Sequence, residues 1–405
     1  MNRREFLKIA CAAGSFSLFP AAKVWALGGA TDLRAQKLVV VFLRGAADGL
    51  SMVVPYGDHN YYSARAPIAI APPGTKDGAI DLDGHFGLHP SLEPVKKYWQ
   101  NKTLAFFYAC GSPDPTRSHF EAQQYMESGA LGGSGETTGW LNRLVQVLPP
   151  RQSLLQALSV AARPARIVAG PAPVAHIEEL DNQVRPLNTN LEPFEKLYAA
   201  SGGEAGKIFI DGVTARKQLQ DRLSTFMREK TEREKKTDQK TDISFGQQLA
   251  YLLKNEPGMQ VAFIDLGFDF WDTHTQQNNL MYYYNSVLAK GLSDLVEGLG
   301  SAYADTTVVV ISEFGRTVKD NGNGGTDHGH GNVMWVLGGG VPGGKVYGRF
   351  DTLATKELHE ERDLPVTTDF RQILGYLLNE RMAVAKVDLA KIFPDFSLYT
   401  NPFIA

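Results

Sequence analysis

The sequence of 405 residues contains only two cysteines, Cys11 and Cys110. Two cysteines cannot build a disulfide framework or a cysteine-rich zinc site. No run of 18 apolar residues occurs, which argues against a membrane-spanning helix. The 41 Lys and Arg residues are balanced by 44 Asp and Glu residues, so the basic excess typical of nucleic-acid-binding proteins is absent. With 43% hydrophobic and 21% charged residues, the composition is that of a globular protein with a large core.

The N-terminal residues predict export. Arg3 and Arg4 precede an apolar stretch of mostly small residues, 9–22, which is the layout of an export signal. The paired arginines resemble the twin-arginine signal, whose export machinery would then be a partner. Cleavage would remove residues 1–26 and leave residues 27–405 without a stable membrane span. We therefore expect a periplasmic or secreted protein, with an ordinary amphipathic N-terminal helix as the alternative.

The apolar pattern predicts an α/β fold. Continuous apolar, β-branched runs typical of buried strands occur at residues 37–43, 103–109, 261–266, 306–312 and 332–337. Helical patterns occur at residues 92–99, 118–127, 278–300 and 368–378. Alternation of strands and helices indicates a mostly parallel sheet with helices on both faces. The segment 150–255 has short strand signals and polar helices, and we interpret it as an insertion or cap.

Ligands of open α/β sheets bind beyond the carboxyl ends of the strands. Polar residues that follow the predicted strands are therefore the candidate site residues. They are Asp48 after 37–43, Arg117, Ser118 and His119 after 103–109, Asp272 and His274 after 261–266, Glu313 and Arg316 after 306–312, and Asp327 and His328 before 332–337.

Asp272 and His274 have the spacing of a metal-binding pair. Two residues apart in an extended segment, their side chains lie on the same side. A carboxylate and an imidazole there can bind one divalent metal, and His328 could add a second imidazole. Asp272 as a turn residue and His274 as an ordinary polar residue are the alternatives.

Ser118 stands at the predicted start of a helix. Free backbone N–H groups at a helix start favour anions, which suits a nucleophile that transiently carries a phosphoryl or sulfuryl group. Arg117 and Arg316 could bind the oxygens of such a group. Alternatively, Ser118 and Glu121 form an ordinary capping box, and Arg316 pairs with Glu313.

Segments along the whole chain resemble the exported family called domain of unknown function 1501, a branch of the alkaline-phosphatase and sulfatase-like superfamily. The segments are FLRGAADGLSMVVPYGD, LDGHFGLHPSLEP, RSHFEAQQYMESG, TGWLNR, FDFWDTHTQQ, ISEFGRT and TDHGHGNVMWVLGGGVPGGKVYG. The resemblance implies an alkaline-phosphatase-like fold with one or two divalent metals. It also implies a Ser, Thr or modified Cys nucleophile at a helix start.

The resemblance assigns roles to the candidate residues. Asp48 takes the place of an early metal-binding aspartate, Asp272 and His274 resemble the pair of one metal site, and His328 resembles the late histidine that completes it. Glu313 stands where the superfamily has an aspartate followed by a histidine, and it is a further candidate metal ligand.

The catalytic positions follow from the same resemblance. Ser118 lies closest to the nucleophile position, and the spacing to Gly129 would fit His119 as well. Because Phe314 replaces the superfamily histidine after Glu313, one metal is the conservative expectation. Arg316 remains a candidate for binding the anion.

We therefore expect an exported, metal-dependent hydrolase of a phosphate or sulfate ester with a small anionic substrate. Its cofactor would be one divalent metal, or two if Asp48 and Glu313 contribute; zinc, calcium, magnesium and manganese are the candidates. The alternative is a non-catalytic periplasmic binding or assembly protein on a degenerate fold of the same type.

Overall fold

The computed structural model describes residues 36–132, 134–150, 153–178, 180, 192–201, 203–237, 242–267, 270–397 and 400–404. The predicted export signal lies outside these residues. Within them, no helix combines the length and the apolar character needed to cross a membrane.

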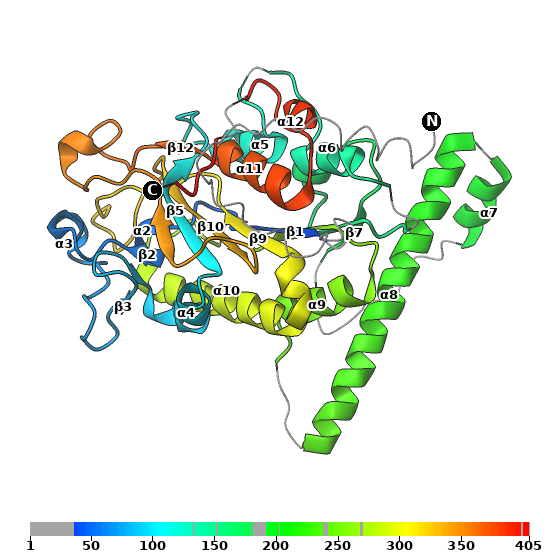
Figure 1. Ribbon diagram of the computed structural model, residues 1–405, viewed down its shortest axis with the longest axis horizontal. Helices are drawn as coiled ribbons and strands as arrows, with labels where there is room; N and C mark the ends of the chain where they lie inside the picture. Colours follow the sequence, from blue (N-terminus) through cyan, green and yellow to red (C-terminus); the bar gives the residue numbers. More distant parts are fainter. Residues whose placement is uncertain are drawn as a thin grey trace, which may run out of the picture. The chain divides into compact units, whose positions relative to one another are not determined.

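The described strands form one large sheet and one small one (Figure 1). The large sheet has the order β11–β5–β10–β9–β1–β8–β6–β7, and β12 also pairs with β5. Its strands are β1 (Lys37–Phe42), β5 (Leu104–Gly111), β6 (Ala157–Val160), β7 (Ala175–Ile177), β8 (Val261–Asp265), β9 (Thr306–Ile311), β10 (Asn332–Gly338), β11 (Lys345–Tyr347) and β12 (Thr368–Asp369). The small antiparallel sheet joins β2 (Val53–Val54), β4 (Gly87–Leu88) and β3 (Ile80–Asp81).

The five predicted strands and the mostly parallel sheet are confirmed. β1 lies between β8 and β9 and pairs parallel with both, so all six of its residues are buried. Burial on both faces explains why its sequence is an unbroken apolar run. β10 is the exception, because it runs antiparallel to β5 and to β9.

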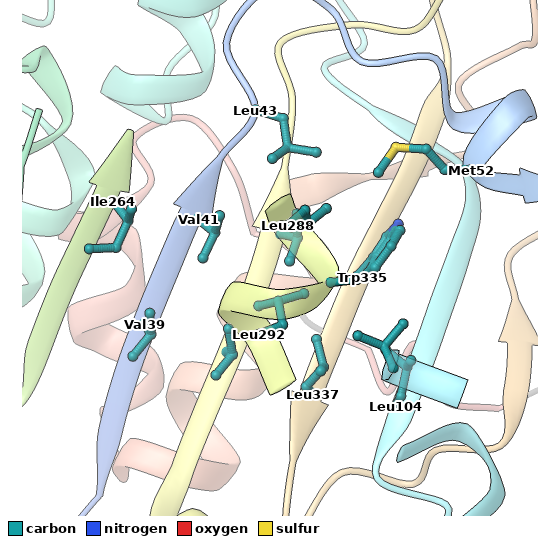
Figure 2. Close-up of a cluster of buried hydrophobic side chains, with 14 of the residues drawn as sticks. Val39, Val41, Leu43, Met52, Leu104, Ile264, Leu288, Leu292, Trp335 and Leu337 are labelled. Carbon is teal, nitrogen blue, oxygen red and sulfur yellow. The ribbon is translucent and has the colours of Figure 1, made fainter. Parts of the chain in front are cut away.

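Helices cover both faces of the large sheet (Figure 1). The described helices are α2 (Gly49–Met52), α3 (His59–Arg65), α4 (Glu93–Gln100), α5 (His119–Ser128), α6 (Trp140–Val147), α7 (Glu192–Ser201), α8 (Gly203–Thr237), α9 (Phe245–Asn255), α10 (Gln277–Leu299), α11 (Phe370–Met382) and α12 (Lys386–Ile392). On one face, alternate β1 residues such as Val39 pack with α4, α9 and α10, including Leu288 and Leu292 (Figure 2). On the other, Val40 and its neighbours pack with α6, α11 and α12. The prediction of helices on both faces is therefore confirmed.

The segment predicted as an insertion or cap, 150–255, contributes to the large sheet as well as carrying helices. β6 and β7 extend that sheet beyond β8. α7 packs against α8, and α8 contacts α9 and β7. Leu219, Leu223 and Phe226 of α8 are buried, whereas most of its other described side chains are exposed or half-buried.

The burial of His89 predicts that the folded state loses stability in acid. His89 is 2% exposed, and burial lowers its pKa to about 4 even though Asp48 acts in the opposite direction. The unfolded chain, with a pKa of about 6.5, binds more protons between these values. Stability should therefore fall by roughly 3 kcal/mol as the pH drops from about 6.5 to about 4. Urea unfolding of the wild type and His89→Gln across this range should show a shallower loss in the variant. Equal slopes would contradict the assignment.

Candidate metal centre

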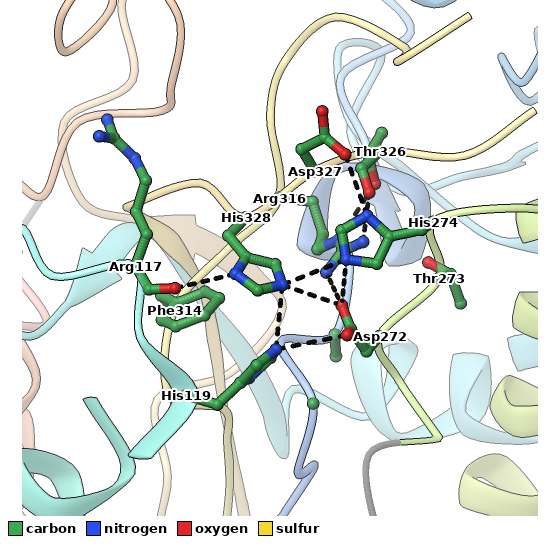
Figure 3. Close-up of polar contacts among 12 residues, drawn as sticks. Arg117, His119, Asp272, Thr273, His274, Phe314, Arg316, Thr326, Asp327 and His328 are labelled. Carbon is green, nitrogen blue, oxygen red and sulfur yellow. Dashed lines mark hydrogen bonds and ion pairs between the residues drawn. The ribbon is translucent and has the colours of Figure 1, made fainter. Parts of the chain in front are cut away.

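Polar loops meet at one edge of the large sheet. The parallel strands β8 and β9 end there, and antiparallel β10 begins there. The loop after β8 carries Asp272 and His274, and the loop before β10 carries His328. β5 ends beside the start of β10 and leads to α5, which begins at His119. The four side chains point toward one another (Figure 3).

The donor atoms of these four residues are closely spaced. The ligand atoms of His119, Asp272 and His328 all lie within 4.8 Å of one another, as needed to share a metal ion. His328 Nε2 is 3.1 Å from His119 Nε2, 3.2 Å from His274 Nε2 and 3.2 Å from Asp272 Oδ1. Asp272 also has Oδ1 3.0 Å from His274 Nε2 and Oδ2 3.5 Å from His119 Nε2.

The other nitrogen of each imidazole, Nδ1, faces an oxygen that accepts a hydrogen bond. These pairs are His119 with Glu313 Oε1 at 2.9 Å, His274 with Asp327 Oδ1 at 3.0 Å, and His328 with the backbone oxygen of Arg117 at 2.8 Å. Each Nδ1 must therefore carry a hydrogen. In the neutral imidazole this leaves Nε2 as a bare lone pair, the form that binds a metal.

The donor set fits a metal ion. Three imidazole Nε2 atoms and a carboxylate converge at separations of 3.0–3.5 Å. Donors about 2.0–2.1 Å from a tetrahedral zinc ion lie about 3.3 Å apart. Lone pairs at this spacing repel one another unless a cation or a proton lies between them. Ligating histidines typically donate their second N–H to a carboxylate or a backbone carbonyl, as all three do here.

Asp272 is held as an anion by the groups around it. Burial favours its neutral form, but hydrogen bonds from His119, His328 and Arg316 hold its pKa well below its usual range. Arg316 is 1% exposed and donates to Asp272 Oδ1. It also donates to the hydroxyl and the backbone oxygen of Thr326. Arg316 thus forms an internal ion pair with Asp272, and its role in binding a substrate anion stays a prediction.

His119 and Glu313 form a second coupled pair. Burial alone would lower the pKa of His119, but hydrogen bonds to Asp272 and Glu313 raise it to about 9. Without a metal, His119 Nε2 therefore carries a proton near neutral pH, and a bound metal would take the place of that proton. Glu313 is 1% exposed, and hydrogen bonds from His119 and Gln123 lower its pKa against the opposing effect of burial. The backbone N–H of Gly45 binds the same Oε1. Glu313 therefore orients His119 and lies behind it, while Phe314 packs against the His119 ring at 5.0 Å between centroids.

Glycines allow the loop before β10 to reach the loop after β8. A Cβ atom on Gly325 would lie 2.3 Å from the carbonyl carbon of His274, and one on Gly329 would lie 2.5 Å from that of Arg316. Both positions therefore require glycine. Gly322 and Gly324 of the same segment instead have positive φ angles of 77° and 72°, a backbone conformation that glycine adopts without strain.

Asp48 does not join the donor group among the described residues. It is completely buried, and both of its oxygens bind the equally buried guanidinium of Arg65. Ser51 and Gln277 each donate to Asp48 Oδ2 at 2.6 Å. The structure therefore places Asp48 in an ion pair rather than beside the three imidazoles.

Ser118 is the residue before α5, with its backbone in an extended conformation. Its side chain makes no capping hydrogen bond, and Glu121 instead accepts a hydrogen bond from Thr116 at 2.6 Å. The capping box is therefore not formed. Ser118 is half-buried and directly precedes His119, whose ring points into the donor group.

Two contributors were not assigned to the site from the sequence. Gln123 donates to Glu313 at 2.8 Å, and Asp363 binds Arg117. They lie on α5 and on a loop near residue 360, where nothing in the local sequence indicates a site. Asp327, which accepts from His274, was a candidate because it directly precedes His328.

Replacing Glu313 by glutamine should weaken metal binding about 10- to 100-fold, the usual cost of losing a partner that orients a ligand. The amide keeps the size of the side chain but removes the charge that makes His119 a stronger donor. Competition with a chelating dye at pH 7 measures the affinity. An unchanged affinity would show that Glu313 does not act through His119.

The fold and the donor group define an α/β protein with a candidate metal centre at the carboxyl edge of its sheet. The chain belongs to the family described as "Protein of unknown function (DUF1501)", whose model matches residues 35–392. This confirms the family membership recognised from the sequence motifs. A comparison with curated proteins finds no match.

Solved structures show distant similarity. The C-terminal periplasmic domain of EcEptC from Escherichia coli has 11% identity and a TM-score of 0.40, with 91% of each chain covered. Its complex with Zn has 10% identity and a TM-score of 0.36, covering 75% of this chain and 72% of that one. The lipoteichoic acid synthase LtaP from Listeria monocytogenes has 11% identity and a TM-score of 0.35, covering 80% and 71%. At this level the activity must be argued from the site itself.

Proposed function

We propose that this protein is an exported, metal-dependent hydrolase of a phosphate or sulfate ester. The observation that carries the proposal is the convergence of three imidazole Nε2 atoms and one carboxylate at a partly exposed sheet edge. The side chains of His274 and His328 are 42% and 26% exposed, so a substrate can reach the group. The alkaline-phosphatase-like resemblance of the motifs supports the choice of an ester substrate.

His119, Asp272, His274 and His328 would hold one divalent metal. A set of three imidazoles and one carboxylate favours zinc over calcium, magnesium or manganese. The metal would act as a Lewis acid that stabilises negative charge developing on the ester. A second metal is not part of the proposal, because Arg65 binds both oxygens of Asp48.

Other side chains of the site would set the charge of Asp272, the orientation of the imidazole rings and the place of the nucleophile. His119, His328 and Arg316 keep Asp272 ionised, so that its charge stays in the site. Glu313, Asp327 and the Arg117 carbonyl fix the ring orientations. Ser118, with a hydroxyl free of capping, stands at the first turn of α5, where unbonded N–H groups favour an anion. We propose Ser118 as the nucleophile on this basis.

A non-catalytic binding or assembly protein is the second candidate. It is favoured by Phe314, which packs against His119 and His328 at 5.0 and 5.3 Å and offers no donor where the superfamily has a histidine. In that case the metal centre would serve binding or stability alone.

One experiment separates the two candidates. Protein exported through its own signal is analysed for metal and assayed with p-nitrophenyl phosphate, bis-p-nitrophenyl phosphate and p-nitrophenyl sulfate, beside Asp272→Ala and Ser118→Ala. About one metal per chain, with turnover lost in both variants, supports the hydrolase. Bound metal without turnover of any ester supports the binding protein. Turnover that survives in Ser118→Ala removes Ser118 as the nucleophile.

Export is tested separately. Replacing Arg3 and Arg4 by lysine should retain the protein in the cytoplasm, because the pathway recognises the paired arginines. Cell fractionation measures this. Undiminished periplasmic protein would contradict the twin-arginine prediction.

A further inference from the structure

Two arginines share one buried carboxylate beside the metal centre. Asp363 has a completely buried side chain. Its Oδ2 binds Arg117 Nη2 at 2.7 Å and Nε at 3.1 Å, and its Oδ1 binds Arg362 Nε at 2.9 Å. The arginine side chains are 29% and 42% exposed, so their guanidinium groups are anchored on one side and reach solvent on the other.

Both arginines are also tied to the metal ligand His328. The backbone oxygen of Arg117 accepts from His328 Nδ1, and Arg362 Nη2 donates to the backbone oxygen of His328. The side chain of Arg117 leads away from the donor group, so its guanidinium lies beside the centre and not within it (Figure 3). A group bound there would be a neighbour of the group bound at the metal.

The exposed carboxylate of Glu360 is bound to the guanidinium of Arg117. Glu360 Oε2 binds Arg117 Nη2 at 2.6 Å, while its Oε1 lies 3.9 Å from His359 Nε2. That nitrogen is buried and has no hydrogen-bond partner among the described residues. The Glu360 side chain is 58% exposed, so a soluble anion can displace it. The side chain of Asp363 is completely buried and cannot be displaced in this way. The carboxylate of Glu360 thus has the place and the partners of a bound anion.

We propose that Arg117, Arg362 and His359 form an anion subsite beside the metal centre. Glu360 occupies it in the free protein, and an anionic group of the ligand replaces Glu360. The planar guanidinium groups suit a phosphate, sulfate or carboxylate. If the protein is the proposed ester hydrolase, its substrate carries a second anionic group besides the ester that is cleaved. This last step rests on the proposed function.

The test measures binding of inorganic phosphate and of sulfate by isothermal titration, on chelator-treated protein so that a metal contributes nothing. Arg117→Gln and Arg362→Gln should each weaken binding about tenfold, the cost of one charge-assisted hydrogen bond. Glu360→Gln should tighten it severalfold, because the competing charge is gone. Arg349→Gln, which removes a positive charge from a 75% exposed arginine, is the matched control and should bind as the wild type does.

The proposal is decided by which variants bind phosphate and sulfate more weakly and which bind them more tightly. Unchanged binding in both Arg117→Gln and Arg362→Gln, or weaker binding in Glu360→Gln, would overturn it. Arg362→Lys keeps the charge but loses the planar guanidinium, so it should bind about as weakly as Arg362→Gln while melting at the wild-type temperature. Wild-type affinity in Arg362→Lys would show a general charge effect and would contradict the proposed role of the guanidinium. Because the protein is metal-free throughout, failure of the hydrolase proposal leaves this result unaffected.

Discussion

Replacing His328 by alanine should abolish metal binding. His328 Nε2 is the central atom of the group, within 3.2 Å of a donor atom of His119, His274 and Asp272. Loss of residues that only orient a ligand already costs 10- to 100-fold in affinity, so loss of this ligand should cost more than about 100-fold. Elemental mass spectrometry after dialysis against zinc should give about one ion per chain for the wild type and almost none for the variant.

Melting temperatures test the same prediction independently. A ligand that binds only the folded state raises the melting temperature, so a chelator should lower it for the wild type and leave His328→Ala unchanged. His59→Ala, a substitution of an exposed histidine at the start of α3, is the control and should behave as the wild type. Full metal content in His328→Ala, with a melting temperature that still responds to the chelator, would contradict the proposed ligand set.

The central strands were predictable because burial on both faces leaves a simple pattern. Residues 37–42 and 306–311 are apolar or β-branched almost throughout, apart from Lys37, and each strand lies in the middle of the sheet. The antiparallel direction of β10 was not predictable, because residues 332–338 are just as buried as those of the parallel strands. Direction is set by the path of the connecting loops, which apolar periodicity does not record.

The sequence predicted where the candidate site lies better than it predicted which charged side chains pair with one another. The rule that ligands gather at strand ends selected the loops that carry Asp272, His274 and His328, and in the structure these three side chains lie together. Whether a carboxylate in such a loop faces a histidine or an arginine depends on contacts that are distant in the sequence. Asp48 meets Arg65, and Glu313 meets His119, 194 residues away. Residue type and spacing alone could not separate these outcomes.

A chain of buried hydrogen bonds links the donor group to Asp48. Arg316 joins Asp272 to Thr326, whose hydroxyl donates to Gln277 Oε1 at 2.6 Å. Gln277 in turn donates to Asp48. Asp48 is thus connected to the donor group through intermediates, and a substitution there should act mainly on the stability of the fold.

Replacing Asp48 by alanine should destabilise the protein by about 3–5 kcal/mol, because it leaves the guanidinium of Arg65 buried without its counter-charge. This is a large fraction of the roughly 5–15 kcal/mol that stabilises a typical protein. Urea unfolding followed by circular dichroism measures the loss. A loss below about 1 kcal/mol would indicate that the pair is not desolvated as the structure describes.

The double substitution Asp48→Ala with Arg65→Met separates a structural role of Asp48 from ligation. Removing both charges also removes the unpaired cation, so the double variant should recover a large part of the lost stability. If Asp48 acts only through the ion pair, the folded double variant should still bind about one metal per chain, since all four donors remain. If Asp48 were itself a ligand, the double variant would recover stability but lose metal. Stability and metal content, measured on the same samples, therefore decide between the two roles.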